Sequence, residues 1–213
     1  YISKLDSFIK DTTHELNTPL SAITMSVETI DKASLDPKTL RKILRIDNAA
    51  KTISSLYQDL SFMALHGKHQ NKDETIEIDK MLNERIEYFE QLADVKNIKF
   101  ETALSSSTIY MDKNKARILI DNLLSNAIKY NKTGGKIIVG AEEQRFWVED
   151  EGKGIPKEKL KDIFARYSRF DDANGGFGIG LNIVKMICDE YFIEINVESE
   201  IKRGTKFELK WEK

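Results

Sequence analysis

One ten-residue stretch, Asn122–Asn131, reads NLLSNAIKYN and decides how the second half of the chain is interpreted. On a helix, four of its polar side chains share one face, at i, i+4, i+7 and i+8: Asn122, Asn126, Lys129 and Tyr130. Amide oxygens are hard neutral ligands that suit Mg²⁺ shared with phosphates, and a lysine beside them can meet phosphate charge. Taken alone, the pattern also fits an ordinary polar helix face, so the flanking motifs must distinguish the two.

The first flanking motif is Asp150–Pro156, DEGKGIP, which follows an expected strand. The Asp150 carboxylate can accept a hydrogen bond from an adenine amino group. Gly152 and Gly154 would let the backbone and a base approach each other closely. By itself the motif is better explained as an ordinary acidic turn.

The second flanking motif is Gly175–Leu181, GGFGIGL, which precedes an apolar helix. It places Gly176, Gly178 and Gly180 before the free N–H groups of that helix, where a phosphate is favoured. Its GxGxG spacing differs from the dinucleotide fingerprint GxGxxG, and the phosphate loop GxxxxGK[ST] is absent. An acidic turn, an amide-bearing helix and a glycine turn together predict a site for a magnesium nucleotide.

A possible nucleophile lies far upstream, in His14–Leu20, HELNTPL. The apolar seam of the expected helix turns His14 toward solvent, with Thr18 one turn further along the same face. A neutral imidazole is a competent nucleophile near neutral pH, and Glu15 can accept the proton of its other ring nitrogen. A surface histidine without a role is the alternative. A zinc motif is excluded, because HExxH requires a second histidine where Thr18 stands.

Residues 1–66 are expected to form an α-helical hairpin. Apolar residues recur at spacings of three and four over 1–33 and over 37–65, and Asp36-Pro37 marks the second helix start. A lone hairpin leaves half of each apolar stripe in water, so a second copy should complete a four-helix bundle in a homodimer. Residues 67–73, GKHQNKD, are expected to be a linker.

Residues 74–213 alternate irregularly between strand and helix patterns. The expected strands span 75–78, 98–103, 108–111, 136–142, 145–150, 193–198 and 205–211. The expected helices span 79–95, 112–130 and 178–191, with Asp79 and Asp112 as N-caps. This order favours an α/β sandwich with a mixed sheet over a doubly wound parallel sheet.

The composition limits the class of protein. The chain has 213 residues, of which 40% are hydrophobic and 32% charged, with a formal net charge of -2. This balance gives no basic field for nucleic acid, so no nucleic acid partner is expected. The single cysteine, Cys188, excludes an internal disulfide. No apolar run approaches the roughly 18 residues that span a bilayer, and we expect a cytoplasmic fragment of a longer protein.

In order along the chain, HELNTPL, NLLSNAIKYN, DEGKGIP, IFARYSRF and GGFGIGL resemble the transmitter region of a bacterial sensor histidine kinase. The resemblance covers essentially the whole chain. It implies a dimerisation and phosphoacceptor hairpin followed by a catalytic ATP-binding domain of the Bergerat type, with ATP and Mg²⁺ bound. It also implies a response regulator receiver domain as partner, and a parent protein attached to the bacterial inner membrane.

The resemblance implies a role for each matched residue. His14 would be phosphorylated, with Glu15 as its base, and Thr18 would help to place water for dephosphorylation of the partner. Asn126 would be the Mg²⁺ ligand and Asp150 would read adenine. The other implied nucleotide contacts are Asn122, Lys129, Tyr130, Gly152, Gly154, Arg169, Gly176, Gly178 and Gly180. Phe164 and Phe170 would pack the lid over the nucleotide.

Two features depart from the family pattern. Position 17 is Asn where related kinases commonly carry Arg or Lys, which removes a charge beside the phosphoacceptor. The lid between Arg169 and Gly175 is only Phe170–Asn174, short for the family.

Two other functional classes remain open at this point. One is an ATPase of the same nucleotide fold that makes no phosphohistidine, as in chaperones or topoisomerases. Such proteins have no reason to carry the pair His14-Glu15 ahead of the nucleotide-binding fold. The other is a dimeric scaffold whose ATP site is dead, against which the intact Asn126, Asp150 and Gly178 argue.

Overall fold

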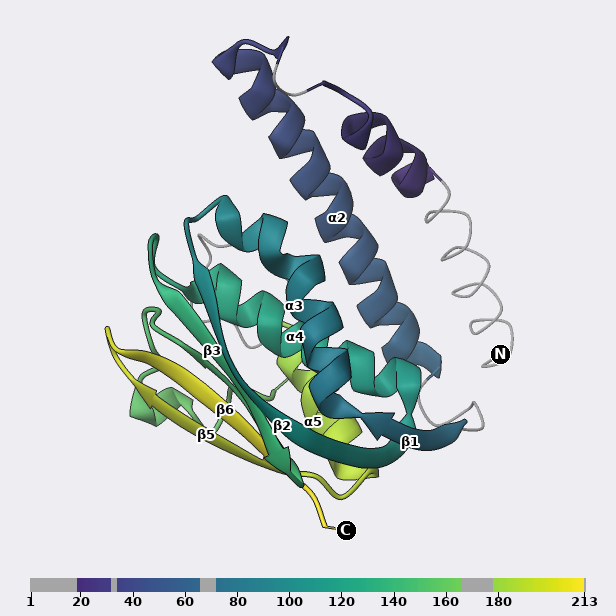
Figure 1. Cartoon of the computed structure of the whole chain (residues 1–213), viewed down its shortest axis with the longest axis vertical. Coiled ribbons are helices and arrows are strands. Elements are labelled where there is room, and N and C mark those ends of the chain that lie inside the picture. The colour runs from purple at the N-terminus through teal and green to yellow at the C-terminus, as the bar shows by residue number, and fades with distance from the viewer. Residues whose placement is uncertain (1–18, 32–33, 66–71, 166–177, 213) are drawn as a thin grey trace. The chain divides into compact units, whose positions relative to one another are not determined.

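The computed structural model describes residues 19–31, 34–65, 72–165 and 178–212 of the chain (Figure 1). The chain divides into two compact units, Tyr1–Gln70 and Asn71–Lys213. The first is helical and the second combines helices with a sheet, which agrees with the fold class expected from the sequence.

The helical unit contains a helix over 19–28 and the long helix α2, Pro37–Leu65. Asp36 starts α2 as expected, because its Oδ1 accepts the backbone N–H groups of Lys38 at 2.9 Å and Thr39 at 3.1 Å. The preceding helix was expected to reach residue 33 but ends at 28. Thr29 bonds back to the carbonyl of Ser26, and such side-chain bonds compete with the helical backbone.

The apolar residues of the helical unit form a covered and an uncovered set. Leu20, Val27 and Ala50 are buried. Ile23 and Ile53 belong to the same apolar stripes and are 41% and 43% exposed. A single hairpin therefore leaves part of its stripes in water, as the sequence predicts.

The second unit is a mixed six-stranded sheet with helices. Its elements are β1 (Asp73–Glu77), α3 (Ile78–Asp94), β2 (Lys99–Asp112), α4 (Lys113–Tyr130), β3 (Lys136–Glu143), β4 (Arg145–Asp150), η2 (Lys157–Lys159), α5 (Gly180–Glu190), β5 (Glu194–Glu200) and β6 (Gly204–Lys210). The strand order is β1-β2-β3-β4-β6-β5. Among these described strands, β2 and β3 pair in parallel and all other neighbours are antiparallel.

The core of this unit lies between the sheet and its helices. Alternate residues of the central strands point into it, including Ile137, Val139 and Leu209, each fully buried. The helices α3, α4 and α5 contribute Leu82, Leu124, Ile183 and Ile187 from their apolar faces. The helices cover one face of the sheet, which gives a two-layer α/β sandwich (Figure 1).

Several boundaries differ from the sequence-based expectation. Two expected strands, 98–103 and 108–111, are one strand, β2, whose register with β3 shifts between Leu104 and Ser107. The helix expected to start at an Asp79 cap begins at Ile78, so Asp79 lies in the first turn and accepts the N–H of Ser107 at 3.3 Å. The strand β1 starts at Asp73, inside the expected linker, and ends one residue before Ile78.

The start of α5 also differs from the expectation. The helix begins at Gly180 rather than Gly178. Gly178 has φ 69°, a left-handed conformation that cannot continue a right-handed helix.

Candidate functional site

The helix α4 carries the centre of the candidate site. As the sequence predicts, the Asp112 carboxylate caps it by accepting the N–H groups of Asn114 at 2.9 Å and Lys115 at 3.2 Å. Its apolar face is buried, through Leu119, Ile120, Leu123, Leu124, Ala127 and Ile128. The predicted polar face is half-buried along its length, at Asn122, Asn126, Lys129 and Tyr130. The packing of the apolar side therefore fixes how this polar face is presented.

Asn122 brings the polar face of α4 to the start of α5. Its Nδ2 donates to the carbonyl of Ile118 at 2.9 Å, which holds the amide in place. Its Oδ1 lies so close to Gly180 that a Cβ at this position would overlap it. Glycine therefore allows the N-terminus of α5, with its free N–H groups, to lie against the amide face, where an anion is favoured.

Asn126 is the residue best suited to a metal ion. Its side chain is half-buried, one turn from Asn122, and has no hydrogen-bond partner among the residues that the structure describes. Within those same residues, no group of three His, Cys, Asp or Glu side chains could hold a metal. One neutral amide fits Mg²⁺ that takes its other ligands from phosphates and water, rather than a cage of protein ligands.

Asp150 is the buried acidic residue of the candidate site. It ends β4, is 8% exposed, and accepts the N–H of Gly152 at 2.7 Å. Burial raises the pKa of this carboxyl to about 6, against the lowering effect of the hydrogen bonds from Gly152 and Thr205. A buried acceptor of this kind is suited to recognise a donor on a bound base.

The turn after Asp150 is attached to the end of α4. The N–H of Lys153 donates to the carbonyl of Tyr130 at 3.2 Å. A Cβ on Gly152 would overlap that same carbonyl, so only glycine permits this approach. The expected acidic turn and the expected amide helix are thus joined directly.

Gly204 holds the Asp150 turn against the β5–β6 hairpin. It has φ 119°, and a Cβ there would overlap the carbonyl oxygen of Asp150. We predict that Gly204→Ala lowers the free energy of unfolding by about 2–4 kcal/mol, combining backbone strain with a backbone clash. Gly134→Ala is the matched control, since Gly134 has φ 73° with nothing near the added methyl. Urea unfolding would measure both, and equal losses would contradict the role given to the Asp150 carbonyl.

A basic cavity of about 380 Å³ adjoins the site at the C-terminal end of α4. Five lysines line it: Lys96, Lys129, Lys132, Lys153 and Lys202. The ammonium groups of Lys129 and Lys153 each lie 4.7 Å from the centre of the Tyr130 ring. Asn122, Asn126 and Asp150 do not line this cavity, so it lies beside the amide face rather than over it.

Two residues that support the site were not found from the sequence. Asn182 follows the glycine turn, and its Nδ2 donates to the carbonyl of Phe164 at 2.9 Å. An amide directly after GxGL was the available signal for Asn182.

Lys96 is the second such residue. Its Nζ donates to the carbonyls of Ile128 at 3.0 Å and Lys129 at 2.7 Å, which caps the end of α4. Desolvation, and then the nearby charge of Lys129, lower the pKa of Lys96.

The remaining predicted residues divide into two groups. Gly154 and Phe164 are half-buried near the Asp150 turn and the start of the expected lid. The other candidates lie outside the described residues: His14, Glu15, Thr18, Arg169, Phe170 and Gly176. Among the helices that the structure does describe, none has the length and apolar character needed to cross a bilayer.

Two protein families match the chain in succession. Residues 4–66 match the His Kinase A phosphoacceptor domain. Residues 111–213 match the ATPase family shared by histidine kinases, DNA gyrase B and HSP90.

Curated relatives match along nearly the whole chain. The sensor histidine kinase YkoH of Bacillus subtilis is 31% identical over 215 residues, covering 96% of this chain and 47% of the relative. The sensor histidine kinase WalK of the same organism is 30% identical, covering 93% of this chain and 35% of the relative. The sensor protein SrrB of Staphylococcus aureus is 31% identical, covering 95% and 37%. The chain therefore spans less than half the length of these relatives.

Solved structures show the same fold. The histidine kinase AdeS of Acinetobacter baumannii superposes with a TM-score of 0.61 at 24% identity, covering 92% of this chain and 96% of that one. Full-length ShkA in complex with AMPPNP gives a TM-score of 0.69 at 23% identity, covering 95% of this chain and 45% of that one.

Proposed function

The chain belongs to the sensor histidine kinase family, as its transmitter region, and we propose that it phosphorylates its own His14 from ATP. The phosphoryl group then passes to an aspartate on the receiver domain of a response regulator. One observation carries this proposal: a phosphoacceptor domain and an ATP-binding domain match the same chain in that order. An ATPase without an acceptor would have no use for the first domain.

The proposed step is an in-line displacement at phosphorus. A ring nitrogen of His14 attacks the γ-phosphorus, a P–N bond forms, and the bond to the β–γ bridging oxygen breaks. That oxygen keeps the electron pair and leaves as part of ADP. Glu15 accepts the proton from the other ring nitrogen. Positioning and charge supply most of the catalysis in such transfers.

The geometry of the described residues of the second unit supports part of the proposed set of nucleotide contacts. Asn126 would hold Mg²⁺, which when bound neutralises phosphate oxygens. The free N–H groups at the start of α5 and the charge of Lys129 would bind the triphosphate, with Asn122 and Gly180 setting its approach. The Asp150 carboxylate would accept a hydrogen bond from the adenine amino group. The implied contacts of Tyr130, Gly152, Gly154, Arg169, Gly176 and Gly178 belong to the same proposal.

The helical unit would work as a homodimer. Exposure of Ile23 and Ile53 in the single chain supports this, because a second hairpin could cover both in a four-helix bundle. Thr18 would help to place water for dephosphorylation of the regulator. We further propose that the longer parent protein is attached to the bacterial membrane and exposes this region to the cytoplasm.

Affinity for ATP is predicted to depend on pH through Asp150. Because its pKa is raised to about 6, the Asp150 carboxyl becomes protonated at a higher pH than an exposed aspartate does. A protonated carboxyl is a poorer acceptor, so ATP affinity should fall between about pH 7 and pH 5. Binding titrations of native protein and Asp150→Asn would measure this.

The Asp150→Asn variant separates protonation of Asp150 from protonation of ATP itself. Asp150→Asn should bind more weakly at neutral pH, yet lack the component of the pH dependence that comes from the protein. Titration of ATP itself is common to both proteins and cancels. Identical pH profiles for the two proteins would refute the role of Asp150.

The function itself is tested by incubation with γ-labelled ATP and Mg²⁺. We expect label to enter the protein, to survive alkali and to be lost in acid, as the P–N bond of a phosphohistidine requires. Hydrolysis of ATP with no label retained would instead indicate a plain ATPase. Binding of ATP with neither retained label nor hydrolysis would indicate an inactive scaffold.

A further inference from the structure

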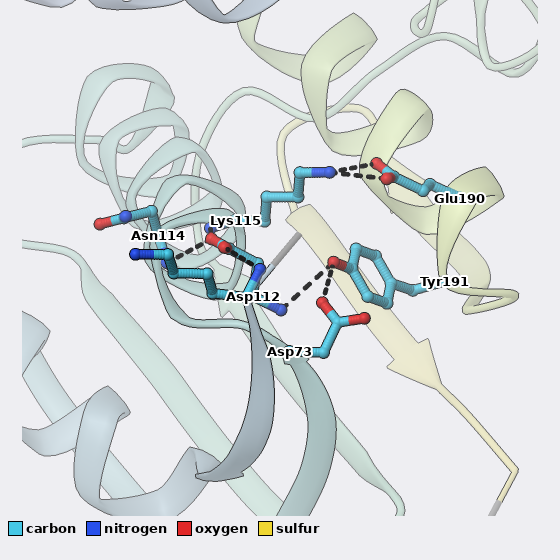
Figure 2. Close-up of polar contacts among 7 residues, drawn as sticks. Asp73, Asp112, Asn114, Lys115, Glu190 and Tyr191 are labelled. Atoms are coloured by element: carbon cyan, nitrogen blue, oxygen red, sulfur yellow. Dashed lines mark hydrogen bonds and ion pairs between the residues drawn. The ribbon is translucent and has the colours of Figure 1, made fainter. Parts of the chain in front are cut away.

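One polar network joins three parts of the second unit that are distant in the sequence (Figure 2). We call it the junction network. It consists of Lys72, Asp73, Asp112, Lys115, Glu190 and Tyr191. These residues come from the entry of the chain into β1, from the start of α4 and from the end of α5.

Tyr191 is the centre of this network. Its hydroxyl donates to Oδ1 of Asp73 at 2.7 Å and accepts the N–H of Asp112 at 3.2 Å. Burial, and then the hydrogen bond to the Asp73 carboxylate, raise the pKa of Tyr191, so the hydroxyl stays protonated as a donor. A second hydrogen bond fixes the segment that enters β1, because the N–H of Lys72 donates to Oδ2 of Asp112 at 3.2 Å.

The same network connects α4 to α5. Lys115 Nζ lies 2.6 and 2.7 Å from the two carboxylate oxygens of Glu190, with both side chains largely shielded from water. Lys115 also lies 5.5 Å from the centre of the Tyr191 ring. The two helices that approach each other at Asn122 and Gly180 are therefore tied a second time, between the first turn of α4 and the last residue of α5.

The position of β1 makes this attachment consequential. β1 is an edge strand of five residues that, among the described strands, pairs with β2 alone. A short edge strand frays readily, and every residue released from it lengthens the connection to the helical unit. A longer connection lowers the effective concentration of one tethered group at another and loosens its orientation.

From these contacts we infer that Tyr191 is a positioning residue for phosphoryl transfer. By fastening Asp73 to the ends of α4 and α5, it fixes where the connecting chain enters the nucleotide-binding unit and so limits that unit's freedom relative to His14. The inference rests on the proposed kinase function. It assigns the junction network a role that does not involve touching the nucleotide.

The test is Tyr191→Phe in the full chain, which keeps the ring and removes the hydroxyl. At saturating ATP the rate of His14 labelling should fall about tenfold, because two positioning hydrogen bonds are lost. Affinity for ATP should stay unchanged. Backbone amides of residues 72–77 should exchange with deuterium faster than in the native chain. Tyr110→Phe is the matched control, since the Tyr110 side chain lies on β2 and is 68% exposed.

A second variant removes the acceptor of the hydrogen bond between Tyr191 and Asp73. Asp73→Ala should also slow labelling, and the double variant should be no slower than Tyr191→Phe, because the bond that Asp73→Ala removes is one of the two already lost with the Tyr191 hydroxyl. A native labelling rate in Tyr191→Phe would overturn the inference. So would ATP affinity that falls in proportion to the rate, or losses that add in the double variant. Native chain labelled in parallel separates the two claims: no label there refutes the kinase proposal as well.

Discussion

Asn126→Ala is expected to remove ATP-dependent labelling almost entirely, by about a hundredfold or more. The reason is geometric and chemical. Asn126 offers a half-buried amide without a partner among the described residues, on the helix face that meets the start of α5. Without an amide oxygen there, the ion shared with the phosphates loses its ligand from the protein. Labelling with γ-labelled ATP at several Mg²⁺ concentrations would measure the loss.

The control for Asn126→Ala is Asn114→Ala. Asn114 lies in the first turn of the same helix and is exposed, so its replacement should leave the labelling rate near that of the native chain. Both variants should keep the native oligomeric state, because neither residue belongs to the helical unit. A native labelling rate in Asn126→Ala would show that the metal site is misplaced.

His14→Gln is expected to abolish labelling while leaving ATP affinity unchanged. Glutamine is polar and of similar size but has no nucleophilic ring nitrogen, so the P–N bond cannot form. His69→Gln provides the control, since no role is assigned to His69. Labelling and ATP titration of both variants would separate loss of the acceptor from loss of the nucleotide site. Normal labelling of His14→Gln would place the acceptor elsewhere.

Local signals predicted the elements that carry the site. The Asp36 and Asp112 caps are confirmed by hydrogen bonds to the helix N-termini that follow them. The helix 112–130 and the strand pair 136–142 and 145–150 lie where periodicity placed them. In each case a cap or a turn and an apolar pattern agree within a few residues, and such agreement is readable from sequence.

Contacts between distant residues account for what the sequence did not reveal. Serines at 105–107 resemble a break between strands, yet the Ser107 hydroxyl donates to the carbonyl of Glu143 at 2.8 Å and β2 continues. Tyr191 and Asp73 are 118 positions apart, so no local pattern could join them. The capping of α4 by Lys96 likewise depends on tertiary packing.

The central claim is that ATP phosphorylates His14, and locating the phosphoryl group by mass spectrometry tests it most directly. The chain would be incubated with Mg²⁺ and ATP, then digested and analysed at alkaline pH. We predict one phosphoryl group on the peptide that contains His14, absent after brief acid treatment and absent from His14→Gln. A phosphoryl group on any other residue, or none while ATP is bound and Mg²⁺ is present, would contradict the account.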